Sequence, residues 1–461
     1  MTDARPVTIA YVGGGSLEWA QVLMADLALE PRLRADVRLY DIDRAAAERN
    51  AAIGARYAPV SLGPPARYRA VGSLAEAMEG ADVVLVSILP GGFDAMASDL
   101  AIPERHGIRQ AVGDTVGPGG FVRALRAVPM MAEILRAAEA HAPEAAICNL
   151  TNPMSVLTGA MHALRPGLRA WGECHELVRV KDQIAMLANR EANEARHDRW
   201  DVEANVLGIN HFTFVDRAAV GGRDMTQAYR AFVAENAARG YHQAETKEGP
   251  EHAHYFGTRN RVAFDLMGRF GIPGAAGDRH MAEFLPAADY LEAHEGWGFT
   301  LTPVEFRRRQ QEARLARAEA LASGGTAPDP VRSAEDITHQ IAGLMGAGAF
   351  VSNVNLPNRG QIENLPMGAI VESNAVFSPL GPTPMLAGRM PDALAAIVAD
   401  HAKRQSALLT AILEERADAL PALFHADPLV RPLPRREADA MLAEMVAATA
   451  NVLPDWVARE L

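Results

Sequence analysis

Two short segments hold a cysteine and a histidine that could bind a metal ion. They are residues 172–176 (GECHE) and residues 208–211 (GINH). A thiolate and an imidazole are good ligands for a divalent cation, so Cys174 and His211 are candidate metal ligands. The two residues lie too far apart in the sequence to form a compact zinc motif. Spacing alone therefore favours the alternative of a buried free cysteine and a hydrogen-bonded histidine.

Two further segments are rich in glycine or asparagine. Residues 112–120 (VGDTVGPGG) set Asp114 among glycines, which suggests a loop pressed against a ligand, or else a flexible surface connection. Residues 148–153 (CNLTNP) end a short apolar run, and open α/β sheets bind ligands at the carboxyl ends of their strands. Asn149 and Asn152 could thus contact a cofactor ribose or a substrate hydroxyl. An ordinary turn before a helix is the alternative, since Asn-Pro often makes one.

The elements that must position these segments follow an alternating pattern. Short apolar runs alternate with stretches of helical spacing, and the runs are residues 7–12, 37–41, 82–89 and 145–150. Residues 122–141 have a clear helical face, with Pro129 expected to bend or break the helix. Alternation of this kind predicts an α/β fold with a parallel sheet covered on both faces.

Two domains are expected for a chain of 461 residues. The first would be a Rossmann-type dinucleotide-binding domain over residues 1–165. The second would be a larger, mixed α+β domain over residues 166–461. Its predicted strands include residues 206–209 and 369–371.

A glycine turn near the start of the chain predicts the cofactor site. Gly13 and Gly15 follow a predicted strand, Ser16 closes the turn, and a helix follows. Glycines let the backbone approach a pyrophosphate, and a helix N-terminus offers it free N–H groups. Glu18 occupies the third glycine position of the usual motif, so a plain turn remains an alternative. Asp41 ends the second predicted strand, where a carboxylate binds a ribose diol and repels a 2′-phosphate, which favours NAD over NADP.

Composition excludes several classes of partner. The chain has 45 Lys and Arg against 57 Asp and Glu, a net charge of -12, without long charge runs. This disfavours nucleic acids and anionic membrane surfaces. No apolar run reaches the roughly 18 residues of a membrane span. The N-terminal residues lack the pattern of a signal peptide, and two cysteines do not form a disulfide framework. We therefore expect a cytoplasmic protein.

Read together, the motifs resemble glycoside hydrolase family 4. The matching segments, in chain order, are VGGGS, VGDTVGPGG, CNLTNP, ECHE, GINHF and GDRHMAEF, and the likeness runs from residue 7 to about residue 380. This resemblance implies a fold like that of lactate and malate dehydrogenases, with an enlarged C-terminal domain that binds metal and substrate. It further implies NAD as a cofactor, a divalent ion such as Mn²⁺ on Cys174 and His211, and a homodimer or homotetramer.

The chemistry of that family is redox-neutral. NAD⁺ takes a hydride from C3 of the sugar, a base removes the acidified C2 proton, and the C1 substituent is eliminated. Water then adds and the hydride returns. A C3 carbonyl polarised by a Lewis acid makes the C2 proton accessible to a side chain. The cofactor supplies the redox step while the protein orients the sugar.

Roles for individual residues follow from the resemblance. Asn149 and Asn152 would contact the cofactor ribose and sugar hydroxyls. Asp114 would lie near the sugar or the departing group, and His175 would assist that group. The substrate that we expect is a small-molecule glycoside.

The C2 base is harder to assign. Phosphosugar members of the family have a tyrosine in the region that corresponds to residues 277–284 (GDRHMAEF), and no tyrosine stands there in this chain. Asp278 and His280 are the substitutes that we consider.

The residues beside Cys174 bear on the substrate. Family members acting on 6-phosphosugars carry CN or CD here, and CHS resembles the α-glucosidase and α-galactosidase group. The CHE triplet of this chain resembles the α-galacturonidase-like group, although Leu177 follows it instead of valine. We therefore expect a non-phosphorylated glycoside, with a uronic acid glycoside such as an α-galacturonide as one candidate. A carboxylate would need a basic partner, for which Arg279 and Arg123 are candidates, unless both are surface residues.

Other functions remain open from the sequence. One is an α-glucosidase or α-galactosidase of the same family. Another is a metal-independent, NAD-dependent 2-hydroxyacid dehydrogenase, against which the Cys174 and His211 pair argues. A catalytically silent NAD-binding regulator is a third, and the polar residues gathered at strand ends argue against it.

Overall fold

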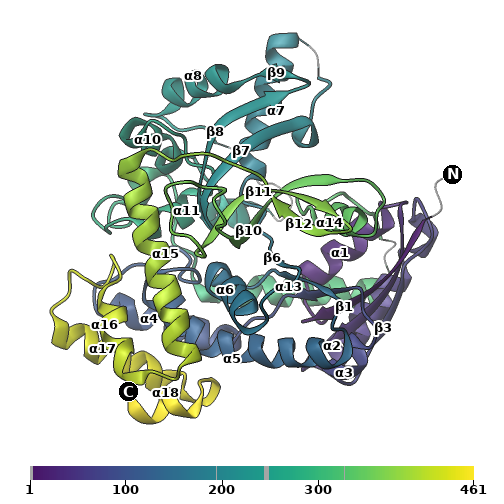
Figure 1. Cartoon of the computed structure of the whole chain (residues 1–461), viewed down its shortest axis with the longest axis horizontal. Helices are drawn as coiled ribbons and strands as arrows, with labels where there is room; N and C mark the ends of the chain where they lie inside the picture. The colour runs from purple at the N-terminus through teal and green to yellow at the C-terminus, as the bar shows by residue number, and fades with distance from the viewer. Residues whose placement is uncertain (1–3, 194, 243–248, 326–327) are drawn as a thin grey trace.

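One large sheet carries several of the polar segments described above at the ends of its strands. The computed structural model describes residues 4–193, 195–242, 249–325 and 328–461. Within these residues, nine strands form the sheet in the order β12-β11-β10-β6-β5-β4-β1-β2-β3 (Figure 1). The glycine turn follows β1, and the CNLTNP and GECHE segments overlap the ends of β5 and β6.

Six strands of this sheet are parallel and come first in the chain. They are β1 (Arg5–Val12), β2 (Leu33–Tyr40), β3 (Arg67–Ala70), β4 (Val83–Val86), β5 (Ala146–Asn149) and β6 (Ala170–Gly172). Their order, 3-2-1-4-5-6, is that of a dinucleotide-binding Rossmann sheet. Every residue of β4 and β5 is buried, as expected for strands with helices on both faces. The predicted α/β fold is therefore confirmed.

Helices cover both faces of the parallel strands. They include α1 (Trp19–Ala28), α2 (Arg44–Ala55), α3 (Leu74–Met78), α4 (Gly92–Arg105), α5 (Gly117–His141) and α6 (Met154–Leu164). Ile9 and Tyr11 of β1 belong to the core formed with α1 and α2, whereas Ala10 and Val12 belong to the core formed with α3 to α6. This alternation follows from the two-residue period of a strand. Helix α5 continues through Pro129, so the possible break there does not occur.

The C-terminal half of the chain extends the same sheet. Strands β10 (Phe350–Pro357), β11 (Ile370–Ser378) and β12 (Gly381–Pro384) are added beyond β6 in antiparallel orientation. The strand expected at residues 369–371 is β11, so it joins the large sheet instead of a separate one. An unpaired edge at β6 would leave backbone groups without partners, and β10 covers that edge. The division of the chain at residue 165 stays a prediction.

A smaller sheet carries the GINH segment. It consists of β7 (Val202–Ile209), β8 (Phe212–Val220) and β9 (Arg223–Asp224), all antiparallel. The amide of Asn374 on β11 donates to the carbonyl of Ala204 on β7 at 2.7 Å, which ties the two sheets together. Strand β7 thereby lies beside β11 of the large sheet.

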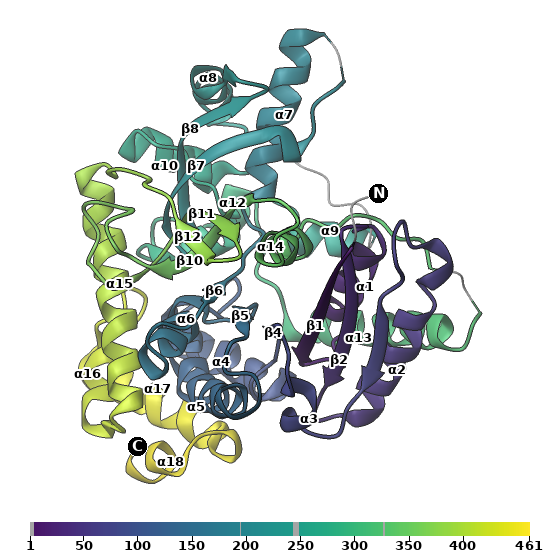
Figure 2. The same ribbon diagram turned by 45° about the vertical axis from the view of Figure 1, so that its right-hand side comes forward.

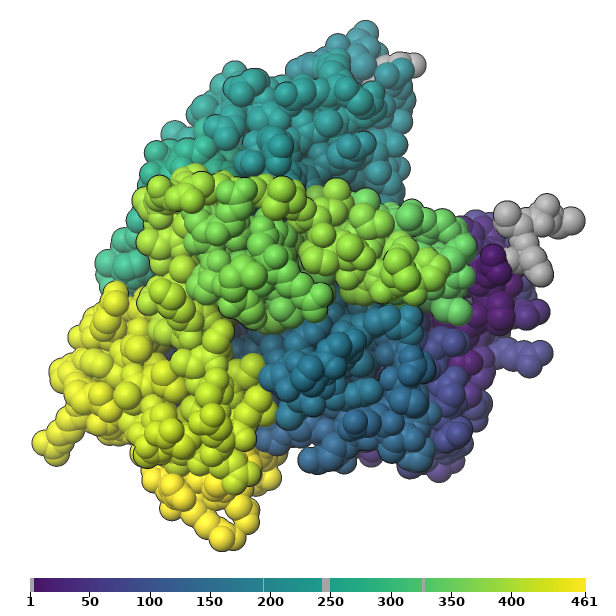
Figure 3. All heavy atoms as spheres, viewed as in Figure 1, coloured from purple at the N-terminus to yellow at the C-terminus, as the bar shows by residue number. Residues whose placement is uncertain are grey.

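The remaining helices follow β6 in the chain. They are α7 (Val178–Ala192), α8 (Thr226–Asn236), α9 (Pro250–Phe256), α10 (Arg261–Phe270), α11 (Asp278–Met281), α12 (His294–Trp297), α13 (Val304–Ala322), α14 (Ile337–Leu344), α15 (Asp392–Leu413), α16 (Leu420–His425), α17 (Arg435–Ala448) and α18 (Asp455–Glu460). Helix α13 packs against α2 and α4 (Figure 2). Helices α15 to α18 form the yellow lobe of the surface in Figure 3. Among the described residues, no helix has both the length and the apolar character needed to cross a lipid bilayer.

Candidate active site

The glycine turn after β1 is too crowded for any larger residue. Gly13 has a φ of +91°, and a Cβ atom there would lie 1.8 Å from the carbonyl oxygen of Ser87. The Asp41 carboxylate accepts a hydrogen bond from the Gly15 N–H at 2.9 Å. Ser16 Oγ accepts from the Trp19 N–H at 3.1 Å and so caps α1. The turn therefore brings bare backbone and a helix N-terminus together beside an acidic side chain, which is the arrangement a dinucleotide needs.

The two asparagines after β5 have different surroundings. Asn149 is fully buried, and its side chain both donates to and accepts from the backbone of Thr151, each at 3.0 Å. These bonds hold the turn after β5. Asn152 instead donates to Asp114 Oδ2 at 3.2 Å, and its backbone carbonyl accepts from Arg123 Nε at 3.0 Å. The structure thus brings together three residues that the sequence analysis assigned separately, namely Asn152, Asp114 and Arg123.

One acidic and two imidazole side chains form the centre of the site. Ligand atoms of Asp114, His211 and His280 all lie within 4.8 Å of one another. The two imidazole rings lie 3.7 Å apart between centroids. Thr115 Oγ1 is 2.8 Å from His211 Nδ1 and 2.7 Å from Asp114 Oδ1, and this hydroxyl fixes both neighbours. We call Asp114, His211 and His280 the central triad.

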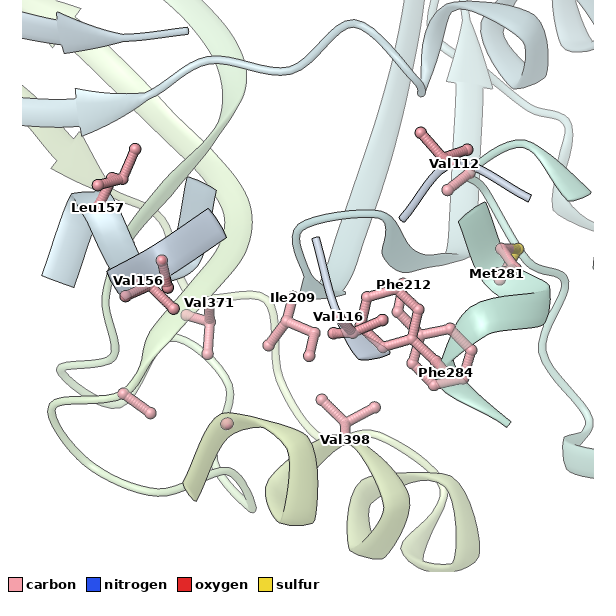
Figure 4. Packing of buried hydrophobic residues seen from close by; sticks show 14 of the residues in the cluster. Val112, Val116, Val156, Leu157, Ile209, Phe212, Met281, Phe284, Val371 and Val398 are labelled. Carbon is pink, nitrogen blue, oxygen red and sulfur yellow. The ribbon is translucent and has the colours of Figure 1, made fainter. Parts of the chain in front are cut away.

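Buried apolar neighbours hold the triad residues in place. Phe212 follows His211 in the chain and stacks on Phe284, with ring centroids 4.9 Å apart (Figure 4). Val112, Val116 and Met281, which flank Asp114 and His280 in the sequence, belong to the same core. His211 itself has a φ of +65° in the turn between β7 and β8. Three segments that are distant in sequence therefore present their polar residues from one packed apolar cluster.

Burial sets the charge states in the triad. Desolvation lowers the pKa of His211 and lowers that of His280 to about 3, so both imidazoles are neutral at neutral pH. For Asp114, burial acts in the opposite direction, but its neighbours, among them the Arg123 guanidinium and the Thr115 hydroxyl, outweigh it and hold the carboxyl pKa below its usual range. One carboxylate and two neutral imidazoles form a donor set suited to a divalent transition-metal ion. The Nδ1 atom of His280 is buried without a hydrogen-bond partner, which is consistent with a role toward a bound group.

Cys174 lies near this centre but is not grouped with the triad. Its thiol is buried and free, and burial, with Glu372 and Glu176 nearby, raises its pKa well above the usual value. Among the described residues, the cluster of side chains that could hold a metal ion consists of His211, Asp114 and His280, and it does not include Cys174. The role of Cys174 as a ligand stays a prediction.

His175 and Glu176 make contacts that the sequence analysis did not predict. Glu335, in the segment before α14, lies 2.9 Å from His175 Nδ1. Although desolvation lowers the pKa of His175, this carboxylate outweighs it and raises the value to about 9. Glu176 accepts from the Gly277 N–H at 2.7 Å, and its other oxygen lies 3.8 Å from His280 Nε2. No sequence signal identified Glu335, because it lies far along the chain in a segment without a motif.

The Asp278 carboxylate stabilises the start of α10. Asp278 is fully buried, and its carboxylate accepts from the Thr258 hydroxyl and from the backbone N–H groups of Arg261 and Ala263. These bonds lie at the N-terminus of α10, where a carboxylate satisfies free donors. Its neighbour His280, by contrast, lies in the central triad.

Basic side chains surround the triad. Arg123 and Arg279 are buried, and desolvation lowers the pKa of Arg123 and lowers that of Arg279 to about 9. Arg307 of α13 joins them, and its pKa is lowered by burial as well. The guanidinium carbons of Arg279 and Arg307 lie 4.7 and 5.4 Å from the ring centroid of Phe256. Arg307 was missed because it stands in an ordinary run of three arginines.

Comparison with known proteins identifies the family. The family 4 glycosyl hydrolase model matches residues 8–190, and the model of that family's C-terminal domain matches residues 206–430. The α-galacturonidase of Thermoanaerobacter italicus is 39% identical, over 98% of this chain and 98% of its own. The crystal structure of the Bacillus subtilis protein LplD covers 95% of this chain and 99% of its own, with 41% identity and a TM-score of 0.89. A 6-phospho-α-glucosidase from gut microorganisms, solved in complex with NAD and Mn²⁺, shares the fold at 18% identity, over 98% and 99% of the two chains, with a TM-score of 0.80.

These matches cover nearly the full length of the chain and of its relatives. They confirm the resemblance to family 4 and to the α-galacturonidase group within it, both of which rested on short motifs. The chain belongs to glycosyl hydrolase family 4.

Proposed function

We propose that the protein hydrolyses a non-phosphorylated glycoside of a uronic acid, an α-galacturonide, with the help of NAD and a divalent ion such as Mn²⁺. The observation that carries the proposal is the central triad, which lies among buried arginines in a chain with a Rossmann glycine turn. The α-galacturonidase of Thermoanaerobacter italicus, similar along its full length, supports this substrate.

The glycine turn would hold NAD. Gly13 and Gly15 let the turn pack closely against Ser87 and Ala46, so its bare backbone and the N-terminus of α1 would receive the diphosphate. Asp41 already accepts from the Gly15 N–H, so its carboxylate is fixed where a ribose diol would bind. Bound NAD supplies reversible hydride transfer at C3 of the sugar. The complex of NAD and Mn²⁺ with the 6-phospho-α-glucosidase of the same fold is consistent with this cofactor choice.

Asp114 and His211 would hold the metal ion, with the Cys174 thiolate as a third ligand. Thr115 would keep His211 in the required orientation through its hydrogen bond to Nδ1. A bound divalent ion supplies Lewis-acid polarisation of sugar oxygens. The buried thiol must lose its proton to act as a ligand, and a nearby cation favours that loss.

Two histidines of this chain would move protons. Among the described residues, the buried Nδ1 of His280 has no hydrogen-bond partner, so this atom would be available as the base that removes the C2 proton. Asp278 suits that role less, because three hydrogen bonds engage its carboxylate. His175 is protonated at neutral pH beside Glu335, so it suits the role of proton donor to the leaving group.

A single experiment tests the proposal. The enzyme is incubated in D₂O with NAD⁺, Mn²⁺ and a panel of nitrophenyl glycosides that includes the α-galacturonide, the α-galactoside and the α-glucoside. We expect nitrophenol release from the galacturonide, deuterium at C2 of the released sugar, and no net NADH. Release only from the neutral glycosides would assign the α-galactosidase or α-glucosidase activity instead. In a parallel incubation with a 2-hydroxy acid in place of the glycosides, net NADH would assign a dehydrogenase. No turnover in either incubation would contradict every enzymatic function considered.

A further inference from the structure

Two arginines beside the central triad, the buried Arg279 and the half-buried Arg307, form no direct ion pair with a described carboxylate. Arg279 donates one hydrogen bond, from an Nη atom to the Ala111 carbonyl at 3.3 Å, and its Nε is buried without a partner. The Nε of Arg307 is also buried without a partner. By contrast, the neighbouring Arg308 and Arg314 of α13 pair with Asp94 and Glu18. Leaving a buried charge without a counter-ion is costly, so the two groups are suited to bind an anion.

Both guanidinium groups contact the same aromatic ring. Their central carbons lie 4.7 Å (Arg279) and 5.4 Å (Arg307) from the centroid of Phe256, which is the last residue of α9. An aromatic ring attracts each cation, but it does not cancel the repulsion between two like charges. An anion that accepts hydrogen bonds from both arginines would cancel this repulsion. A planar carboxylate fits this task because its two oxygens match the paired donors of a guanidinium.

The position of the pair relates it to the sugar. Arg279 immediately precedes His280 of the central triad in α11. Asp114, also of the triad, exerts the strongest electrostatic attraction on Arg307, ahead of Glu18 beside the glycine turn. The triad would engage the C2 and C3 side of a sugar ring, so the arginines lie where a substituent on the same small ligand can reach them.

Arg123 has a structural role near Asp114. Its Nε donates to the backbone carbonyl of Asn152, whose side chain donates to Asp114. This chain of contacts fixes the loop that carries the Asp114 carboxylate. Of the two arginines that the sequence analysis nominated for a carboxylate, Arg279 is therefore the better suited, and its partner is Arg307.

We propose that Arg279 and Arg307 bind the carboxylate of the substrate sugar, and that Arg307 of α13 is the residue that selects an acidic sugar over a neutral one. This inference rests on the proposed hydrolysis of a uronic acid glycoside. A cofactor diphosphate is another anion of similar chemistry, because Arg314 of the same helix pairs with Glu18 next to the glycine turn. Arg307, however, shares the Phe256 ring with Arg279, which adjoins His280 of the triad, and we therefore assign the carboxylate.

Arg308, the next residue in α13, provides a matched control. Its guanidinium pairs with the exposed Asp94 at 2.7 Å, away from Phe256. We compare Arg307→Gln, Arg307→Lys and Arg308→Gln in the full-length enzyme with NAD⁺ and Mn²⁺. The measurements are steady-state kinetics on nitrophenyl α-galacturonide, competitive inhibition by free galacturonate and by galactose, calorimetric titration with NAD⁺, and a melting curve for each variant.

For Arg307→Gln we expect KM for the galacturonide and Ki for galacturonate to rise about 10- to 100-fold, since a hydrogen bond to a charged group contributes about that much affinity. Inhibition by galactose and the Kd for NAD⁺ should not change. Arg307→Lys should recover part of the affinity, and Arg308→Gln should behave as the parent enzyme.

Each contrary outcome has its own meaning. Unchanged KM and Ki in Arg307→Gln, in an enzyme that cleaves the galacturonide, would overturn the inference and leave the proposed function standing. A weaker NAD⁺ complex with unchanged Ki for galacturonate would assign Arg307 to the cofactor diphosphate and overturn the inference as well. A parent enzyme that neither cleaves the galacturonide nor binds galacturonate would overturn the proposed function together with the inference.

Discussion

Nδ1 of His175 and Oε1 of Glu335 lie 2.9 Å apart, although His175 follows β6, the last parallel strand, and Glu335 stands far along the chain, just before α14. His175 also lies against Trp19 of α1, with ring centroids 5.3 Å apart. The pair therefore joins the first helix after the glycine turn to the segment after β6 and to the segment before α14. Through this contact the imidazole is both oriented and held in its protonated form.

Replacing Glu335 by glutamine should reduce proton donation by His175. We expect kcat to fall about 10- to 100-fold on an alkyl α-galacturonide, within the range that general acid catalysis contributes. The loss should be much smaller on a nitrophenyl galacturonide, because nitrophenolate leaves without a proton. KM should stay unchanged on both substrates. Glu48→Gln, which affects an exposed glutamate paired with Arg44, serves as the control. Equal losses on the two substrates would contradict a role in leaving-group protonation.

Metal binding should depend on Thr115 as well as on His211. Removal of the metal with EDTA should abolish glycoside cleavage, and added Mn²⁺ should restore it. His211→Ala should lose Mn²⁺ binding in a calorimetric titration. Thr115→Val should weaken it about 10- to 100-fold, because the variant lacks the hydroxyl that orients His211. Thr410→Val, at an exposed threonine of α15, is the control. Parent-like Mn²⁺ affinity in His211→Ala would rule out the proposed metal site.

Gly13→Ala should weaken NAD⁺ binding. The added Cβ would lie 1.8 Å from the Ser87 carbonyl oxygen, so the turn after β1 must shift. We expect the Kd for NAD⁺ to rise about tenfold or more, corresponding to roughly 1.4 kcal/mol. Gly107→Ala is a matched control, since Gly107 also has a positive φ, +81°, but an added Cβ there meets no atom within 4 Å. It should bind NAD⁺ normally, and a Gly13→Ala enzyme that also did so would refute the assignment of the turn.

The stability of the fold should fall at mildly acidic pH because of His401. This buried imidazole accepts from Arg404 at Nδ1 and lies 2.7 Å from the Phe284 carbonyl at Nε2, and burial lowers its pKa to about 3. Since the unfolded chain takes up the proton near pH 6.5, the stabilisation is present above that pH and is lost as pH falls toward 3. Between pH 7 and pH 5 the free energy of unfolding should drop by about 2 kcal/mol from this group alone.

Urea unfolding of the parent enzyme and of His401→Gln at both pH values measures this effect. The glutamine variant should be less stable at pH 7 but should lose about 2 kcal/mol less on acidification. An identical drop in both proteins would show that His401 is not the responsible group.

Local sequence patterns predicted a large part of the fold. The apolar runs at residues 7–12, 37–41 and 145–150 became β1, β2 and β5, because each run encodes its own extended conformation and its burial. The turn at Gly13 was also predictable, since a positive φ and a close backbone approach require glycine. Six short motifs were enough to indicate the family, because they keep their order along the chain.

The sequence by itself determined the Rossmann order of elements, the glycine turn and the residues of GECHE, GINH and GDRH that surround one centre. Only the tertiary structure decided which of them meet. It grouped His211 with Asp114 and His280, added β10 to β12 to the parallel sheet, and brought Glu335 to His175 and Arg307 to Arg279. Glu335 and Arg307 come from segments that carry no motif. Their proximity to His175 and Arg279 depends on how the segment before α14 and α13 pack. Short-range periodicity encodes the elements, whereas the contacts between distant side chains depend on the packing of the whole chain.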